Sequence, residues 1–493
     1  MTTTFHAPYA HLPTGLAAQV RITIDEGRFT GIETGAAARP GDRQLPGVLL
    51  PGFANAHSHA FHRALRGRTH DEGGTFWTWR ERMYAVAAQL EPATYLSLAR
   101  AVYAEMALAG VTAVGEFHYL HHGPGGKRYL DPNAMGKALV KAAADAGIRL
   151  TLLDAIYLSG GLVNGEHLPL ERAQLRFGDG EVTAWAMRVE DLRDATDGGP
   201  AHLRVGAAIH SVRAVPREHL GQVAAWARGE LGGRDLLASG PADRFDPDPA
   251  RSARPLHLHL SEQPAENDAC LEAYGLTPTG LLEAEGVLGA DVTVVHATHL
   301  SGADIAALGT HRCWACFCPT TERDLADGIG PAVSLQRAGA RLSLGSDQHA
   351  VVDLIEEARA LEMHERLASL ERGRLAPDAL LQAATAHESL GWPDAGRIEV
   401  GARADLVAIR LDTVRTAGAD PAQILLVASA SDVDTVVVDG TVVVQDGRHR
   451  LGDVGAMLSE AIEPLWRPAP DKPQPDGPHL DKIASVPTQG DLS

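Results

Sequence analysis

The chain has 493 residues and a formal net charge of −19 at pH 7, with 45% hydrophobic and 22% charged residues. This composition is typical of a globular protein with a large core, and the acidic balance argues against nucleic acid or an anionic membrane as a partner. No apolar run approaches the ~20 residues that span a bilayer, and the first residues lack the basic and apolar regions of a signal peptide. We therefore expect a cytoplasmic protein.

Cysteine usage agrees with a reducing compartment. Cys313, Cys316 and Cys318 lie close together, and Cys270 lies apart. The spacing of Cys313 and Cys316 is that of a zinc knuckle, but a second pair that would complete a closed tetrahedral site is missing from the sequence. We expect buried, reduced thiols.

The first 47 residues contain short strand-like segments, for example 19–24 and 28–32. From residue 48 onward, apolar runs alternate with helical stretches such as 94–109 and 354–367, which is the pattern of βα units. The eight runs are 48–53, 111–117, 148–156, 203–209, 255–260, 292–295, 314–318 and 341–344. They predict an α/β fold in which residues 48–390 form a (β/α)8 TIM-like barrel, with its active site where the strands end.

The remaining segments are assigned as follows. Residues 159–201 and the Gly/Asp/Pro-rich residues 229–254 read as loops inserted into the barrel. After residue 390 strands return, and Asp439-Gly440 between two valine runs predicts a hairpin. We expect residues 391–452 to pair with residues 1–47, so that both chain ends build one small β-domain. Residues 467–493 are rich in proline and read as a disordered tail.

Histidine and aspartate side chains gather at the ends of four of these runs. His57 and His59 follow the first, His257 and His259 end the fifth, His296 ends the sixth and Asp347 follows the eighth. Buried polar groups at a barrel mouth are costly unless they are bonded, and a shared metal bonds several at once. The joint pattern therefore predicts a metal site.

The predicted ligands are His57, His59, one histidine of the fifth strand, and Asp347. The spacing does not choose between His257 and His259, because both lie on one face of the strand. Three nitrogens and a carboxylate suit Zn²⁺, one ion per subunit, and Fe²⁺ is not excluded by ligand type.

Two further residues are assigned catalytic roles. Glu262 is placed to take a proton from water and hand it to a leaving nitrogen, and its alternative role is a carboxylate at a helix N-terminus. His296 would orient the attacking hydroxide or stabilise charge developing on the attacked carbon. Asp347 would act both as a ligand and in catalysis.

This constellation resembles the amidohydrolase superfamily, in particular its mononuclear deaminase branch. The resemblance covers residues 5–452 and includes the segment Gly-Ala-Arg-Ala-Asp-Leu-Val at residues 401–407. The family places its third histidine ligand three residues before the catalytic glutamate, which implies His259 as the ligand and Glu262 as the proton shuttle. It also implies a homodimer.

Four motifs narrow the resemblance to the formimidoylglutamate deiminases. They lie at residues 55–61 (Asn-Ala-His-Ser-His-Ala-Phe), 76–84, 115–122 and 318–328. Enzymes of that family hydrolyse N-formimino-L-glutamate to N-formyl-L-glutamate and ammonia in histidine degradation. The implied partner is thus a small dicarboxylate that carries a formimino group.

Such a substrate needs groups that bind carboxylates. The resemblance implies His210, Arg213 and Tyr119 for this role, with Arg82 as a weaker candidate. For Arg80 an ion pair elsewhere is the expected role. The planar guanidinium of arginine suits bidentate carboxylate binding.

One position departs from the family. Where the family commonly has glutamine, this chain has His62, whose imidazole can donate to a carboxylate but whose charge depends on pH. Substrate affinity that varies with pH, or a changed side-chain preference, is a possible consequence. Trp77 and Trp79 are expected to pack in a lid.

Two other classes of function remain open. A deaminase of a purine-like heterocycle predicts stacking aromatic rings in the pocket in place of paired cationic groups. A non-catalytic assembly protein on the same barrel predicts lost metal ligands, whereas all four are present here, as is Glu262.

Overall fold

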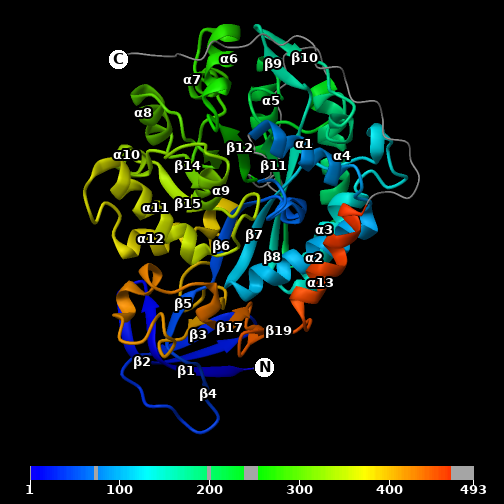
Figure 1. Cartoon of the computed structure of the whole chain (residues 1–493). Coiled ribbons are helices and arrows are strands. Elements are labelled where there is room, and N and C mark those ends of the chain that lie inside the picture. Colours follow the sequence, from blue (N-terminus) through cyan, green and yellow to red (C-terminus); the bar gives the residue numbers. More distant parts are fainter. Residues whose placement is uncertain (1, 71–75, 197–200, 238–253, 468–493) are drawn as a thin grey trace.

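The computed structural model describes residues 2–70, 76–196, 201–237 and 254–467. Its larger part is an α/β barrel (Figure 1). The eight parallel strands are β6 (Phe53–Ser58), β7 (Val111–His118), β8 (Arg149–Ile156), β11 (Leu203–Ile209), β12 (Leu256–Leu260), β13 (Val292–His296), β14 (Trp314–Phe317) and β15 (Arg341–Leu344). Nearly all of their residues are buried, as expected for strands covered on both faces. The predicted (β/α)8 barrel is confirmed.

The barrel closes where its first and last strands meet. Ser58 and Asp347 form a parallel bridge, the Asp347 amide donates to the His57 carbonyl at 3.0 Å, and the His59 amide donates to the Asp347 carbonyl at 3.1 Å. A Cβ at Gly345 would lie 2.7 Å from the His57 Cβ, so only glycine permits this approach. The seam thus brings the two histidines of β6 against the aspartate that follows β15.

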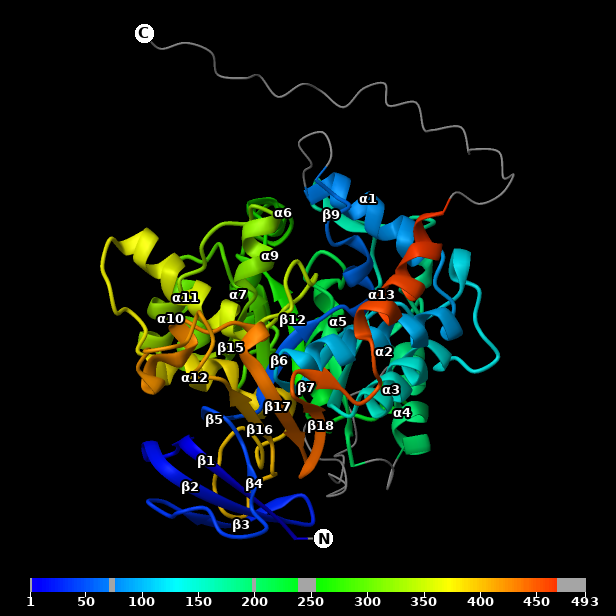
Figure 2. The same cartoon turned by 60° about the horizontal axis from the view of Figure 1, so that its bottom comes forward.

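Helices surround the barrel (Figures 1 and 2). Their bounds are α1 (Phe76–Ala87), α2 (Pro92–Leu108), α3 (Ala134–Ala146), α4 (Val182–Thr196), α5 (Arg217–Ala227), α6 (Pro264–Tyr274), α7 (Pro278–Ala284), α8 (Gly302–Thr310), α9 (Pro319–Asp324), α10 (Ala332–Ala338), α11 (Leu354–Ser369), α12 (Pro377–Ala384) and α13 (Val454–Ile462). Helices α2 and α11 correspond to the two predicted from the sequence.

A second, mixed sheet forms from both ends of the chain, as predicted. Its order is β19-β18-β17-β16-β5-β1-β2-β3, with β4 paired to β1. The strands are β1 (Thr3–Leu12), β2 (Gly15–Asp25), β3 (Arg28–Glu33), β4 (Arg43–Gln44), β5 (Val48–Pro51), β16 (Leu406–Ile409), β17 (Val433–Val438), β18 (Thr441–Gln445) and β19 (Arg448–His449). The predicted hairpin joins β17 and β18, with Asp439 and Gly440 at φ of 45° and 75°.

The assignment of residues 48–53 to the first barrel strand is wrong. Residues 48–51 form β5, which pairs with β1 and β16 in the small sheet, and the barrel strand β6 begins only at Phe53. Gly52 separates the two strands. The apolar run looks continuous in the sequence because both strands are buried. His57 therefore lies within the first barrel strand, and His59 directly follows it.

Arg149 of β8 fastens the small sheet to the barrel. Its fully buried guanidinium pairs with the buried carboxylate of Asp405, just before β16, and its Nη1 lies 3.1 Å from Asp439 of the β17–β18 turn. The small sheet also has an apolar core of its own, to which both chain ends contribute. The two parts are thus joined by a buried ion pair as well as by packing.

The first predicted insertion has regular structure in place of a plain loop. It contains the hairpin β9 (Gly161–Val163) and β10 (Glu166–Leu168), followed by α4. Most of the second insertion, 238–253, and the predicted tail from residue 468 lie outside the described residues. The four cysteines are free and buried, as expected.

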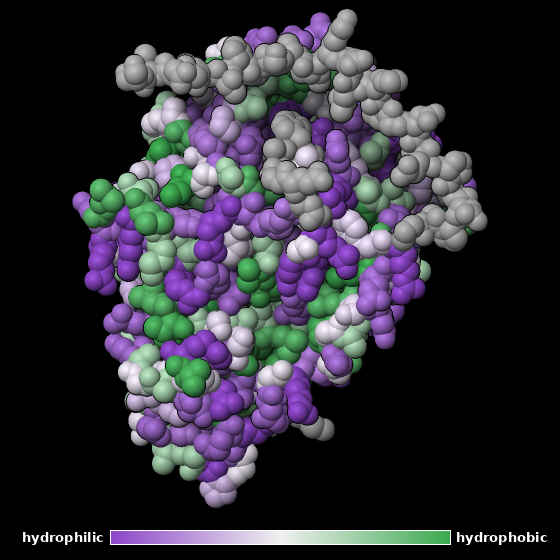
Figure 3. Space-filling view, in the orientation of Figure 1, coloured by the Kyte–Doolittle hydropathy of each residue, from purple (hydrophilic) through white to green (hydrophobic). Residues whose placement is uncertain are grey.

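The face shown in Figure 3 mixes hydrophilic and hydrophobic residues over both the barrel and the small sheet. Among the residues that the structure describes, every helix is too short or too polar to traverse a bilayer.

Candidate metal centre and active site

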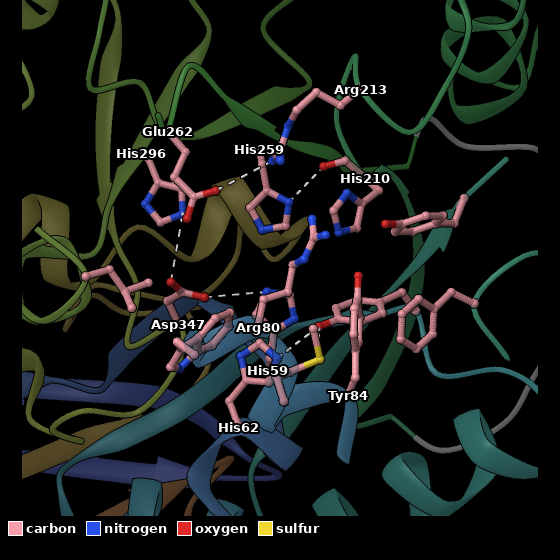
Figure 4. Close-up of a pocket in the computed structure, with 16 residues that line it drawn as sticks. His59, His62, Arg80, Tyr84, His210, Arg213, His259, Glu262, His296 and Asp347 are labelled. Atoms are coloured by element: carbon pink, nitrogen blue, oxygen red, sulfur yellow. Dashed lines mark hydrogen bonds and ion pairs between the residues drawn. The ribbon is translucent and has the colours of Figure 1, made fainter. Parts of the chain in front are cut away.

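Four predicted ligands meet at the carboxyl ends of the strands. His57 Nε2 lies 3.3 Å and His59 Nε2 3.5 Å from Asp347 Oδ1, and His259 Nε2 lies 3.2 Å from His57 Nε2. All four side chains are buried, and the cavity beside them is drawn in Figure 4. Two overlapping groups, His57–His59–Asp347 and His57–His259–His296, each bring their ligand atoms within 4.8 Å of one another, close enough to hold a cation, and they share His57.

Backbone carbonyls orient two of the imidazoles. His59 Nδ1 donates to the Phe117 carbonyl at 2.9 Å, and His259 Nδ1 donates to the His210 carbonyl at 2.8 Å. A proton on Nδ1 leaves Nε2 with its lone pair directed at the cluster, as in metal-bound histidines. His257, in contrast, donates its Nε2 proton to the Ser389 carbonyl, away from the cluster.

The protonation states suit a cation. Burial lowers the pKa of His57 to about 3 and lowers the pKa values of His59 and His259, which keeps the three rings neutral. Burial opposes ionisation of Asp347, but its hydrogen bond with His57 and the nearby histidines hold its pKa well below the usual range. Neutral imidazoles and an ionised carboxylate are what a metal requires, so the donor set fits one.

Glu262 and His296 stand beside the four ligands. Glu262 Oε1 lies 3.7 Å from His296 Nε2, which in turn lies 3.8 Å from Asp347 Oδ2. Burial disfavours protonation of His296, but the charges of Glu262 and Asp347 and a hydrogen bond to Glu322 raise its pKa well above the usual value. The imidazolium is thereby held among three carboxylates, with Glu262 and Asp347 near Nε2 and Glu322 near Nδ1.

The backbone is strained at three of these strand ends. Ser261, His296 and Asp347 have φ of 49°, 68° and 41°, in the left-handed region that non-glycine residues seldom adopt. Such conformations cost roughly 1–3 kcal/mol each and cluster at functional sites. These backbone conformations therefore lower the local stability, and they set the directions of the side chains at the strand ends.

The cavity beside the cluster contains nearly all of the predicted substrate-binding residues. Its walls are formed by His59, His62, Trp79, Arg80, Met83, Tyr84, Tyr119, Tyr157, Phe177, His210, Arg213, His259, Glu262, His296, Leu325 and Asp347 (Figure 4). His62 Nε2 lies 2.9 Å from the Tyr119 hydroxyl. Burial lowers the pKa of His62 to about 3, so its ring is neutral and gives no reason for pH-dependent affinity near neutrality.

Arg213 and His210 enter the cavity from the segment after β11. Arg213 Nε lies 3.2 Å from Glu266 Oε2, and its Nη2 lies 3.8 Å from Glu262 Oε2. Burial lowers the pKa of His210 well below the usual value, so the ring is neutral. Both residues lie where the sequence placed them.

Helix α1 presents Arg80, and not Arg82, to the cavity. Trp79, Arg80, Met83 and Tyr84 line it together, whereas Arg82 is absent from the lining among the described residues. Successive helical residues are 100° apart, so Arg82 points about 200° from Arg80. The pattern of residues 76–84 does not indicate which face of this helix covers the barrel.

Sequence reasoning missed several other residues of the site. Tyr157 and Phe177 line the cavity without a motif that marks them. Glu322 accepts hydrogen bonds from His296 Nδ1 at 3.4 Å and from the Cys318 amide at 2.8 Å. Its position inside the motif at 318–328 was a signal for this role.

A parallel barrel that gathers three histidines, an aspartate and a glutamate at its mouth defines a metal-dependent hydrolase. Residues 48–216 and 248–443 match the model of the amidohydrolase family, and residues 2–45 match that of the formimidoylglutamate deiminase HutF N-terminal domain. The chain belongs to the amidohydrolase family and, within it, to the formimidoylglutamate deiminases.

Individual relatives agree with this. The chain is 36% identical to the formimidoylglutamate deiminase of Pseudomonas aeruginosa over 460 residues, covering 90% of this chain and 95% of the relative. It is 29% identical to the 8-oxoguanine deaminase of the same organism over 474 residues, covering 90% and 94%. A crystal structure of an amidohydrolase from Brucella melitensis superimposes with a TM-score of 0.82 at 31% identity, covering 94% of this chain and 99% of the other.

Proposed function

We propose that this protein hydrolyses the formimino C=N bond of N-formimino-L-glutamate, giving N-formyl-L-glutamate and ammonia, with one zinc ion per subunit. The observation that carries the proposal is a single cavity that combines the metal ligand set with two arginines, Arg80 and Arg213. A dicarboxylate with a reactive C=N bond needs both features.

His57, His59, His259 and Asp347 would hold the metal. Three imidazole nitrogens and one carboxylate are typical ligands of catalytic zinc, and Fe²⁺ is the alternative with the same ligands. When bound, such an ion polarises the substrate and lowers the pKa of water toward ~7.

Glu262 is proposed to move the protons of the reaction. Its carboxylate takes a proton from the attacking water and delivers it to the imino nitrogen, and then moves the second proton from the new hydroxyl group to the departing nitrogen as the C=O bond forms. A C–O bond forms, the bond to the terminal nitrogen breaks, and ammonia leaves. His296, held between Glu262 and Asp347, donates a hydrogen bond toward the developing charge.

The remaining polar residues are proposed to bind the two carboxylates of the substrate. Arg213, His210, His62 and Tyr119 all line the cavity, and the Tyr119 ring lies next to both His62 and His210. Arg80 adds a second guanidinium from α1. Of the residues predicted for this role, Arg82 alone has no support from the cavity.

A heterocycle deaminase remains the second candidate, because the cavity also contains aromatic rings. Trp79, Tyr84, Tyr119, Tyr157 and Phe177 all line it. Aromatic walls alone therefore do not discriminate, and the paired arginines decide for the dicarboxylate.

The test is ammonia release by the zinc-loaded protein from N-formimino-L-glutamate, guanine and 8-oxoguanine, together with a metal analysis. We expect ammonia from the first compound only and one zinc per subunit. Ammonia from either purine but none from formiminoglutamate would overturn the proposal. The family resemblance also supports a homodimer, which light scattering measures.

A further inference from the structure

A larger cavity lies beside the active-site cavity and shares part of its lining. The active-site cavity measures about 80 Å³, and its neighbour, here called the side chamber, about 340 Å³. Arg80, Tyr157, His210 and Arg213 line both. A group attached to a bound substrate at this shared wall would project into the side chamber.

The hairpin β9–β10 and helix α6 form the outer walls of the side chamber. Leu162 and Leu168 of the hairpin and Ala269 of α6 give it an apolar lining. His167 Nε2 lies 2.8 Å from the Tyr274 hydroxyl, a hydrogen bond that fastens the hairpin to the end of α6. The insertion in the barrel thus encloses space beside the cavity that contains Glu262 and the candidate metal ligands.

The charges around the side chamber favour an uncharged occupant. Arg213 at the shared wall pairs with Glu266 and faces Glu262. Arg80 and Arg213 line the side chamber together with Glu171 and Glu266, so the formal charges of these four side chains cancel and do not attract a further anion. An amide carbonyl, in contrast, still accepts a hydrogen bond from a guanidinium.

We propose that the side chamber is a second substrate subsite, which takes an uncharged, largely apolar group attached through an amide to one of the two carboxyl carbons of the formimino amino acid. The inference rests on the proposed function and extends its substrate class. The chemistry at the C=N bond is the same: water adds, the bond to the terminal nitrogen breaks, ammonia leaves, and the amide bond stays intact.

The experiment compares N-formimino-L-glutamate with its α- and γ-benzylamides, using ammonia release and the zinc-loaded full chain. Three proteins are used: the wild type, Ala269→Phe, which narrows the side chamber, and Glu272→Phe, a matched change at an exposed position of α6 outside the lining. We expect the wild type to hydrolyse one benzylamide with kcat/KM within about tenfold of the parent compound, because burial of the benzyl group in an apolar pocket is favourable. In Ala269→Phe the ratio of kcat/KM for that amide to the parent should fall at least tenfold, and in Glu272→Phe it should not change.

The outcomes separate the two proposals. If the parent is hydrolysed but neither benzylamide is hydrolysed or binds by calorimetry, the subsite does not exist. An unchanged ratio in Ala269→Phe has the same meaning. If the parent itself is not hydrolysed, the proposed function fails, and calorimetric binding of a benzylamide that Ala269→Phe weakens still supports the subsite.

Discussion

At the scale of single residues, the site depends on groups whose states are set by their surroundings. Glu262 has His296 on one side and Arg213 on the other, and its carboxylate is buried. A carboxylate in this position can act as the base that takes a proton from water, and a cationic neighbour holds it in place.

Replacing Glu262 with glutamine removes the proton shuttle but leaves the four ligands in place. Turnover of formiminoglutamate should fall by a factor of about 10²–10⁴, which is what general acid–base catalysis contributes. Zinc content, measured by atomic absorption, should remain at the wild-type level. A variant with near wild-type kcat would show that another residue moves the protons.

Arg80 and Arg82 form a matched pair on one helix. Arg80→Ala should raise KM for formiminoglutamate by about tenfold or more, because a charge-assisted hydrogen bond to a carboxylate is lost. Among the described residues, Arg82 is not part of the cavity lining. Arg82→Ala should therefore change KM by less than about threefold. Steady-state kinetics on both variants decides the assignment, and the reverse order would restore Arg82.

Behind the ligands, Glu116 orders the segment that carries His57 and His59. Its fully buried carboxyl group, whose pKa is raised to about 8 by burial, accepts from the Ala60 amide at 2.6 Å and from the Ser58 hydroxyl at 2.7 Å. Glu116→Gln retains only one acceptor oxygen and should weaken zinc binding by about 10–100-fold, the usual effect of removing a group that supports metal ligands. Competition with a chelating dye measures this, and wild-type affinity would contradict the role.

At the scale of elements, the barrel and the small sheet are joined through Arg149. Burial alone would lower the pKa of this guanidinium, but the carboxylates of Asp405 and Asp439 outweigh it and raise the pKa. A buried ion pair adds little compared with an apolar contact, yet breaking it is costly because the partner charge stays behind.

Arg149→Met should therefore lower the free energy of unfolding by about 3–5 kcal/mol, since Asp405 would be left buried without its cation. Urea denaturation followed by circular dichroism measures the loss. Arg410→Met, in a pair with Asp412 in which both side chains are exposed, serves as control and should leave the free energy of unfolding almost unchanged. An equal decrease in the free energy of unfolding in both variants would show that the buried ion pair of Arg149 has no special role in stability.

How far the sequence predicted these elements depended on the signal each carries. The strand ends that bear His259, His296 and Asp347 were found because alternating apolar runs mark buried parallel strands and polar residues interrupt them. The first barrel strand was misplaced because the apolar residues of β5 continue into Phe53 of β6, and only the pairing of the two strands distinguishes them. The choice between Arg80 and Arg82 failed for a similar reason, because neighbouring positions on a short helix differ only in direction. The side chamber has no sequence signal, because three separate segments enclose it.

At the scale of the whole molecule, the metal should contribute to stability as well as to catalysis. A ligand that binds only the folded state at 100 times its dissociation constant adds about 2.7 kcal/mol. Removal of the metal with a chelator should abolish turnover and lower Tm by several degrees, and added zinc should restore both. Calorimetry with and without chelator measures the shift, and an unchanged Tm would place the ion outside the cluster.

The first and last barrel strands meet at Ser58 and Asp347, and this links binding of the proposed ion to folding. Its ligands are separated by almost 300 positions along the chain, from His57 to Asp347. During synthesis, therefore, a nascent polypeptide that ends before β15 cannot assemble the complete coordination set, and full-affinity zinc uptake would report that the ring of strands has been completed. Metal binding by the complete proposed ligand set would therefore follow the closure of the barrel.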